Sequence, residues 1–174
     1  MSLLGLKRGT VALLPHQTDW ERIAADTAVR LRSFFPDAEI AHVGSTAIPH
    51  IAAKPIIDMA VGVDDLSYVK EMAPALEPQG LLFRGEDVNG QLLFVLGEQD
   101  CRTHHIHIVQ RQGVEWQNYI RFRDYLTAHP DRAREYERLK QDLAERYPQD
   151  RASYTEGKAD LIREILAESA ADKE

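Results

Sequence analysis

Residues 42–61, HVGSTAIPHIAAKPIIDMAV, combine a small polar turn with an acid inside an apolar run. Gly44-Ser45-Thr46 interrupts a short apolar segment, and Asp58 is the one charged residue of IIDMAVGV at 56–63. Glycine lets backbone N–H groups approach a phosphate closely, and the Ser45 hydroxyl can add a hydrogen bond. A neighbouring aspartate suits Mg²⁺, which binds carboxylates together with substrate phosphates. This spacing therefore predicts a metal–phosphate site, with Gly44, Ser45 and Thr46 on the phosphate and Asp58 as metal ligand and catalytic residue.

Each of these residues also has a structural interpretation. A Gly-Ser pair is common in simple tight turns. Asp58 could be a buried acid paired with Lys54 or an arginine, because an unpaired buried charge is costly. Lys54 could reach a phosphate or extend from a loop into solvent. Because the turn and the acid occur together, we favour a functional site with Lys54 as a phosphate ligand.

Two histidines are candidates to complete that site. The segment THHIHIVQ at 103–110 alternates as a half-buried strand does, so His105 and His107 share one face and His104 lies on the other. With Asp58 they could form a three-ligand site for Zn²⁺, Mn²⁺ or Fe²⁺ with an open position for water. One histidine could instead bind a phosphate oxygen or serve as a general base, for which His107 is the candidate. The pattern H-x-H is weak on its own, and both residues could be ordinary buried or surface histidines.

Here the sequence resembles the GrpB-like proteins, which are assigned to the nucleotidyltransferase superfamily. That superfamily has a Gly-Ser pair followed, about a dozen residues later, by an acid–apolar–acid strand, and Gly44-Ser45 and Asp58 match it. The likeness continues through HIHIV at 105–109, FRDYL at 122–126, HP at 129–130, EYERLK at 135–140 and YTEGK at 154–158. It implies a nucleotidyltransferase-like fold, a divalent metal (Mg²⁺ or Mn²⁺, with Zn²⁺ as an alternative), and Tyr154 and Lys158 directed toward the ligand. A similar domain is fused behind dephospho-CoA kinase in some bacteria, which suggests a partner enzyme in coenzyme A metabolism.

The sequence departs from this pattern at one position. The second acid of the strand would fall at residue 60, where the chain has Ala60. Transfer chemistry with two metal ions usually uses two or three carboxylates. Either other side chains complete the site, or the protein binds a ligand without the standard reaction.

In the last third, four cations interrupt the otherwise inward faces of the expected helices. The default interpretation is that each lies on a solvated surface; the four are Arg121, Arg123, Lys140 and Lys158. Tyr154 and Lys158 are one helical turn apart and can face one neighbour. Gly157 between them costs about 1 kcal/mol relative to alanine inside a helix, which suggests a close contact there, with the ligand as one candidate.

Periodicity and turn residues predict an α+β protein with a mixed β-sheet, flanking helices and a helical C-terminal third, in one domain over 1–174. A capping box of Thr18 and Glu21 is expected to start the first helix. Asn89-Gly90 predicts a hairpin turn. Strands are expected at 9–14 (a short strand or ordered arm), 39–43, 56–63, 81–85, 91–97 and 103–110, and helices at 18–35, 66–79, 114–128, 130–147 and 151–169.

Composition limits the class of protein. The 174 residues carry 21 basic and 28 acidic side chains, a net charge of −7, which argues against broad nucleic-acid binding but not against a local phosphate pocket. Cys101 is the only cysteine, and MSLLGLKRG at 1–9 lacks the charge order of a secretory signal. No segment approaches the roughly 18 apolar residues of a membrane span. We therefore expect a cytoplasmic protein that does not bind membranes.

Three functions follow from these residues. The first is metal-dependent nucleotidyl transfer, with a nucleotide or another phosphate-bearing small molecule as the ligand. The second is a non-catalytic module that binds a nucleotide or a coenzyme-A-type ligand. The third is a different metalloenzyme that uses Asp58, His105 and His107.

Overall fold

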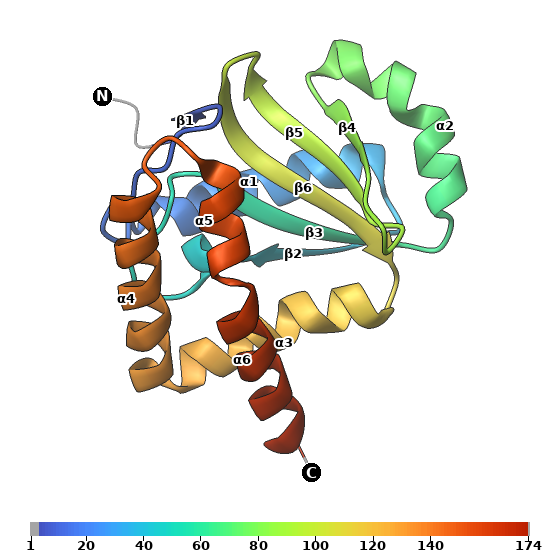
Figure 1. Ribbon diagram of the computed structural model, residues 1–174. Helices are drawn as coiled ribbons and strands as arrows, with labels where there is room; N and C mark the ends of the chain where they lie inside the picture. Colours follow the sequence, from blue (N-terminus) through green and yellow to red (C-terminus); the bar gives the residue numbers. More distant parts are fainter. Residues whose placement is uncertain (1–3, 174) are drawn as a thin grey trace.

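The computed structural model describes residues 4–173; the first three residues of the segment 1–9 and the final Glu174 lie outside them. A six-stranded mixed sheet runs through the centre (Figure 1). Its order is β2-β3-β6-β5-β4, with β1 paired to β6; the β3–β6 pairing is parallel and the others are antiparallel. The strands are β1 (Leu6–Lys7), β2 (Glu39–Val43), β3 (Ile57–Val63), β4 (Leu82–Glu86), β5 (Leu92–Glu98) and β6 (Cys101–Gln110).

Helices cover both faces of the sheet (Figure 1). They are α1 (Asp19–Phe34), α2 (Leu66–Leu76), α3 (Val114–Ala128), α4 (Pro130–Arg146), α5 (Arg151–Gly157) and α6 (Ala159–Ala171), with 3-10 turns η1 (Ser45–Ala47) and η2 (Glu77–Gln79). The expected α+β architecture, with a mixed sheet, flanking helices and a helical final third, is confirmed.

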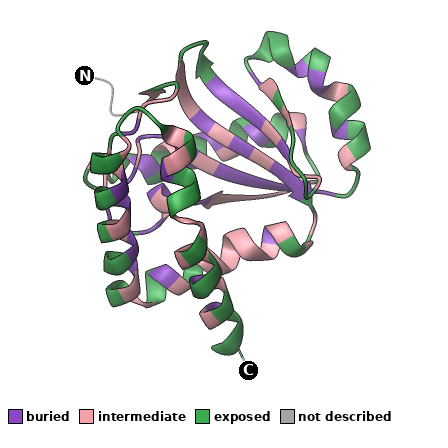
Figure 2. Cartoon of the chain, in the orientation of Figure 1, coloured by how far each residue is buried: buried purple, intermediate pink, exposed green. Residues whose placement is uncertain are grey.

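The two faces of the sheet differ because side chains alternate along a strand. On one, which we call the core face, Ile57, Met59, Ile106 and Ile108 pack with Trp20 of α1 and with α2 in the largest apolar cluster. On the other, which we call the cavity face, Asp58, His105 and His107 lie next to the C-terminal helices. Figure 2 shows the buried positions following the central strands and the inner sides of the helices.

The C-terminal helices differ from the prediction at one point. The helix expected over 151–169 is two helices, α5 and α6, which meet at Gly157 and Lys158. A Cβ added to Gly157 would lie 2.5 Å from Leu143 Cδ2 of α4, so helix packing requires the glycine. The close contact expected near Gly157 is therefore with Leu143.

Two expectations near the N-terminus are settled by the structure. Of the two alternatives for residues 9–14 the strand is not found: Leu14 makes an isolated bridge to Ala53, Val11 N donates to the Pro148 carbonyl, and the short β1 lies earlier, so the segment is an arm. Thr18 makes no side-chain cap to α1, and Glu21 instead contacts His16 at 2.9 Å, so no capping box forms.

The remaining boundaries agree with the sequence to within a few residues. The expected helix over 66–79 ends as an α-helix at Leu76 and continues as η2 to Gln79, with Gly80 in the left-handed conformation after it. Asn89 and Gly90 lie in the turn between β4 and β5. Within residues 4–173, no helix has the length and apolar character needed to cross a membrane.

Candidate functional site

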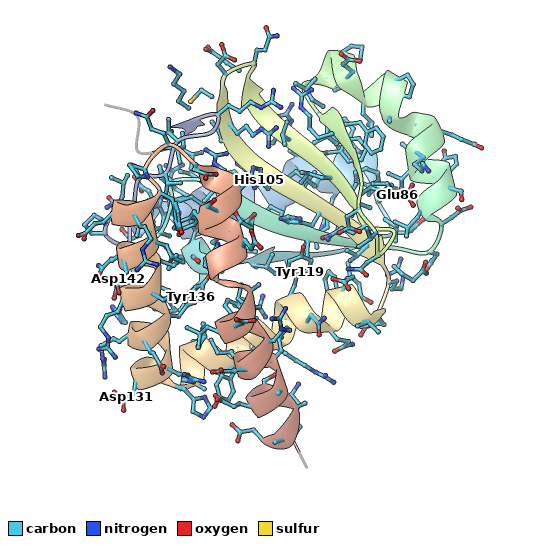
Figure 3. All side chains as sticks on the ribbon, viewed as in Figure 1. Glu86, His105, Tyr119, Asp131, Tyr136 and Asp142 are labelled. Atoms are coloured by element: carbon cyan, nitrogen blue, oxygen red, sulfur yellow. The ribbon has the colours of Figure 1, made fainter. Side chains whose placement is uncertain are left out.

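A cavity of about 480 Å³ opens between the cavity face of the sheet and the C-terminal helices. Nine residues that the sequence singled out all line it: Gly44, Ser45, Thr46, Lys54, Asp58, His105, His107, Tyr154 and Lys158. Figure 3 shows His105 on the sheet, with Tyr119 and Tyr136 on helices around the same region. Residues from the whole length of the chain therefore meet in one space.

Strand pairing brings Asp58 to the two histidines. The parallel register places Asp58 opposite His105, and His107 lies one pleat further on the same face. Asp58 Oδ1 is 3.0 Å from His107 Nε2 and 3.6 Å from His105 Nδ1. One ligand atom from each of the three residues can be chosen so that all lie within 4.8 Å of one another. That spacing suits one metal ion with a free position toward the cavity.

The carboxyl group of Asp58 stays ionised in this setting. Burial by itself would raise its pKa, but hydrogen bonds with His105 and His107 outweigh burial and hold the pKa far below its usual range. The ring of Tyr119 packs on His107 with centroids 5.0 Å apart, which fixes the orientation of that imidazole. An ionised carboxylate beside oriented imidazoles is ready to accept a cation or a proton.

Gly44 is required by its contact with Asp58. Its φ of 72° lies in the region that favours glycine, and an added Cβ would be 2.7 Å from Asp58 Oδ2. The turn after β2 therefore lies directly against the carboxylate. In the same turn Ser45 is hydrogen-bonded to Tyr136, and Thr46 is buried with its hydroxyl 2.8 Å from His42 Nε2.

Two lysines and a tyrosine form the opposite wall. The Nζ atoms of Lys54 and Lys158 lie 5.0 and 4.7 Å from the centre of the Tyr154 ring. Burial and their mutual repulsion lower the pKa of Lys54 to about 7, and burial lowers the pKa of Lys158 to about 8. The Tyr154 hydroxyl is buried and has no hydrogen-bond partner. An anion bound here would gain two cations and one free donor.

Lys140 is a buried residue that the sequence interpretation missed. It donates a hydrogen bond to the Ala52 carbonyl, while Glu137 accepts one from the Ala52 amide, so α4 holds the loop that carries Lys54. Burial lowers its pKa to about 7. The expectation of solvated cations was wrong here: Lys140 is buried, and Arg121, Arg123 and Lys158 are half-buried. The spacing of Ala133, Tyr136, Lys140 and Leu143 already put Lys140 on the inward stripe of α4.

Arg151 is a further cavity residue that was not predicted. It shares a helical face with Tyr154 and Lys158, at spacings of three and seven, and this pattern could have revealed it. Its guanidinium donates to the carbonyl oxygens of Lys7 and Thr10 at 3.0 Å each.

Tyr119, Tyr136 and Glu115 also line the cavity. Their helical positions resemble ordinary core positions, so local sequence gave no signal.

The position of the missing second acid is apolar. Ala60 is fully buried and packs with Val43, Val109 and Trp116. A pair of Mg²⁺ ions held by adjacent strand carboxylates therefore does not fit this site, because the strand position that would supply the second carboxylate beside Asp58 is Ala60. One carboxylate and two imidazoles fit a single Mn²⁺, Fe²⁺ or Zn²⁺ ion better, since imidazole is a preferred ligand of these metals.

Comparison with known proteins identifies the family. A family model described as GrpB protein matches residues 10–168. The chain belongs to the GrpB family. The glutamate-rich protein GrpB of Alkalihalophilus pseudofirmus is 38% identical over 173 residues, covering 95% of this chain and 99% of that protein. A UPF0157 protein of Pseudomonas aeruginosa is also 38% identical, covering 92% of this chain and 68% of its own length.

Solved structures agree with that assignment. The crystal structure of the conserved protein GrpB from Enterococcus faecalis superposes with a TM-score of 0.85 and 30% identity, covering 93% of this chain and 99% of that one. The Cid1 poly(U) polymerase, in its MgATP-bound form, is a distant structural neighbour with a TM-score of 0.46 and 15% identity. The superposition covers 73% of this GrpB chain and 45% of the polymerase chain. A likeness this remote assigns no role to any residue here.

Proposed function

We propose that this GrpB protein binds one divalent transition metal at Asp58, His105 and His107 and, beside it, a phosphate-bearing small molecule held by Lys54 and Lys158. The observation that carries the proposal is the convergence of two features in one cavity. Three metal-ligand atoms lie within 4.8 Å of one another, and two lysines face the same space. A nucleotide fits this combination of metal, phosphate ligands and an apolar-lined cavity.

Each residue has a defined task in this proposal. Lys54 and Lys158 neutralise the anion, and the free hydroxyl of Tyr154 donates a hydrogen bond to it. The backbone of the turn at Gly44-Ser45 approaches the ligand on the side of Asp58. The divalent ion that Asp58, His105 and His107 would hold would polarise phosphoryl oxygens and so favour attack at phosphorus. The reaction class is nucleotidyl transfer: an acceptor hydroxyl oxygen bonds to the α-phosphorus as the bond to pyrophosphate breaks, and the hydroxyl proton passes to solvent water.

If no metal binds, the same residues support a different use. His107 is 3.0 Å from Asp58, which is the geometry of a general base oriented by a carboxylate. His107 would then remove a proton from the acceptor. Metal ligation and base catalysis by His107 are alternatives, and metal analysis separates them.

A second function is a binding module without catalysis, acting through a partner enzyme. Ala60 favours it, because a single carboxylate provides less than the two-metal reaction normally uses. The ligand would again be a nucleotide or a coenzyme-A-type molecule, in the same cavity. Binding with no turnover in the presence of metal distinguishes this function from the first.

The test begins with elemental analysis of the purified protein and of Asp58→Asn and His107→Gln. We expect about one equivalent of Mn, Fe or Zn in the parent protein and loss of most of it in both variants. His129→Gln, which lies outside the cavity lining, is the matched control and should keep the metal. Absence of metal in the parent protein, with no shift in melting temperature on adding Mn²⁺ or Zn²⁺, would remove the metal from the proposal.

Ligand binding is then measured by calorimetry with ATP and with adenosine. Binding of ATP but not of adenosine, weakened at least tenfold by Lys54→Gln, supports the phosphate pocket. Turnover of ATP that disappears in Asp58→Asn supports transfer chemistry. Equal binding of ATP by the parent protein and Lys54→Gln would contradict the assignment of this lysine.

A further inference from the structure

A second hollow lies beside the cavity, and Glu115 lines both. The hollow measures about 310 Å³ and is formed by the turn between β4 and β5 and the first turn of α3. A hydrogen bond also joins the two spaces, because Tyr119, which lines the cavity, donates its hydroxyl proton to Gln91, which lines the hollow. The hollow is therefore a direct neighbour of the proposed ligand site.

The directions of the strands place the hollow and Lys54 at opposite ends of the cavity. Since β3 and β6 are parallel, the end of the sheet where β3 begins is opposite to the end where β6 finishes. Lys54 comes three residues before β3, and Glu115 comes five residues after β6 (Figure 1). His107 is in the middle of the paired stretch, and Tyr119, one helical turn after Glu115, packs on it with ring centroids 5.0 Å apart. The metal-ligand residues therefore lie between Lys54 and Glu115.

The proposed reaction needs its acceptor on one particular side of the phosphorus. In phosphoryl transfer the attacking and leaving oxygens lie roughly in line. Lys54 and Lys158, which lie on the same tyrosine ring, would hold the negative phosphates, so pyrophosphate leaves toward their end of the cavity. The acceptor oxygen then has to approach from the other end, where Glu115 and the hollow lie.

The polar groups of the hollow suit hydroxyl groups without a negative charge. The amides of Asn89, Gln91 and Gln110 and the carboxylate of Glu115 line it, and no lysine, arginine or histidine of the described chain does. The Glu115 side chain has no hydrogen bond or ion pair with another described residue. No side chain caps the start of α3, so its first backbone N–H groups are free to donate. A hydroxyl group can use donors and acceptors alike, whereas an anion would be repelled by the carboxylate in the same turn.

We propose that the hollow and Glu115 form the acceptor subsite, and that the acceptor is an uncharged polyhydroxyl compound of about the size of a monosaccharide. The inference rests on the proposed function, because it names the second substrate of the same reaction. One hydroxyl oxygen of the acceptor bonds to the α-phosphorus, the bond to pyrophosphate breaks, and the hydroxyl proton passes to solvent water. Glu115 is a positioning residue that accepts a hydrogen bond from another hydroxyl group of the acceptor.

The experiment measures the binding of glucose, myo-inositol and glucuronate by saturation-transfer NMR, and the binding of ATP by calorimetry. We expect glucose or myo-inositol to bind at least tenfold more tightly than glucuronate, which has the ring of glucose and a negative charge. Glu115→Gln should reduce this preference at least fivefold, because it removes the charge that repels glucuronate. Glu71→Gln, at an exposed position of α2 on the core face, is the matched control and should keep the full preference.

Val114→Trp tests the same subsite without changing its charge. Val114 is 74% exposed and lines the hollow, so a larger side chain there should fill the hollow and reduce binding of the uncharged compounds at least tenfold. The melting temperature of each variant shows that it is folded, and Val114→Trp carries the test if Glu115→Gln is not.

The inference is overturned if neither uncharged compound binds while ATP does, or if glucuronate binds as tightly as glucose. It is also overturned if the folded variants Glu115→Gln and Val114→Trp bind all three compounds as Glu71→Gln does. Failure of ATP to bind would instead contradict the proposed function, and the inference with it.

Discussion

His104 and His105 are neighbours on β6, but they face opposite sides of the sheet and have different surroundings. His104 is buried on the core face, where Nε2 is 2.9 Å from Thr27 Oγ1 and Nδ1 is 2.8 Å from Thr103 Oγ1. Thr27 donates its own proton to the Ile23 carbonyl, so it accepts from His104 Nε2–H, and Thr103 donates to Nδ1. His105 is half-buried beside Asp58 and leaves Nε2 without a partner.

The difference shows which polar groups the fold has satisfied and which it leaves for a ligand. On the core face both nitrogens of the histidine have partners, and burial lowers its pKa to about 4, so it stays neutral. On the cavity face, donors, acceptors and charges are left without protein partners. Buried polar groups normally have partners, and two of the four such atoms that lack one in the described part of the chain, His105 Nε2 and the Tyr154 hydroxyl, belong to residues that line the cavity.

The sharpest test of this contrast substitutes one large residue on each face. Phe94→Ala on the core face should lower the free energy of unfolding by about 3–5 kcal/mol, because Phe94 is fully buried in the main apolar cluster. Lys54→Met on the cavity face should leave the free energy of unfolding unchanged or raise it, while weakening ATP binding. Urea titration measures the first quantity and calorimetry the second. A loss of stability in Lys54→Met as large as in Phe94→Ala would break the comparison.

The second prediction concerns the turn against Asp58. Gly44→Ala should cost about 1–3 kcal/mol for the positive φ and should also displace the Asp58 carboxylate, so that metal binding falls at least tenfold. Gly9→Ala is the control, because Gly9 has a φ of +82° but no atom within 4 Å of its added Cβ. Gly9→Ala should lose a similar amount of stability because of its positive φ, and it should keep the bound metal. Equal metal content in the two variants would show that the contact with Asp58 does not matter.

A smaller effect is expected from the histidine on the core face. Thr27→Val removes the acceptor of His104 Nε2–H and should lower stability by about 1–3 kcal/mol, since a buried donor is left without a partner. Metal content and ATP affinity should stay at the parent values. A fall in metal content without loss of folded protein would show that the two faces are coupled through β6.

A pH dependence is expected from three buried lysines in and behind the cavity wall. The pKa values of Lys54, Lys140 and Lys158 in the folded protein are about 7, 7 and 8, below the value of about 10.4 expected in the unfolded chain. Between these values the unfolded chain holds more protons, so stability rises with pH between about 7 and 10, by at most about 1.4 kcal/mol per pH unit for each lysine. Below about pH 7 all three lysines are protonated in both the folded and the unfolded protein, so their contribution to stability no longer changes with pH.

Urea titrations from pH 6 to 10 measure this slope. Lys54→Met and Lys158→Met should each flatten it, whereas Lys70→Met, at an exposed lysine paired with Glu86, should not. The same titration applies to binding: an anionic ligand keeps the lysines charged, so binding near pH 8 should take up protons. A stability that falls from pH 7 to pH 9 in the parent protein and not in Lys54→Met would contradict these pKa directions.

Local patterns predicted most of the elements. The alternation of 103–110 placed His105 and His107 together and His104 apart, as found. The apolar run around Asp58 gave β3, and Asn89-Gly90 gave the turn between β4 and β5. These features depend on residues a few positions apart, which the sequence displays directly.

The features that could not be predicted depend on residues far apart in the chain. The end of α5 at Gly157 was not predicted, and the Leu143 side chain that lies against this glycine comes from α4. The contact between His107 and Asp58 joins residues 49 positions apart, and only the parallel register of β3 and β6 specifies it. The spacing put Lys140 on the inward stripe of α4, but its partner, the Ala52 carbonyl, is a backbone atom 88 positions away that side-chain patterns do not show.

The break between α5 and α6 has a consequence for how the binding space is enclosed. All six strands and Asp58, His105 and His107 precede residue 111, whereas Arg151 and Tyr154 belong to α5 and Lys158 joins α5 to α6. A chain cut before α5 would keep the metal-ligand residues but lose this wall, so that bulk water would reach them. The residues that screen Asp58, His105 and His107 from bulk water on this side therefore come from a later part of the chain than the sheet itself.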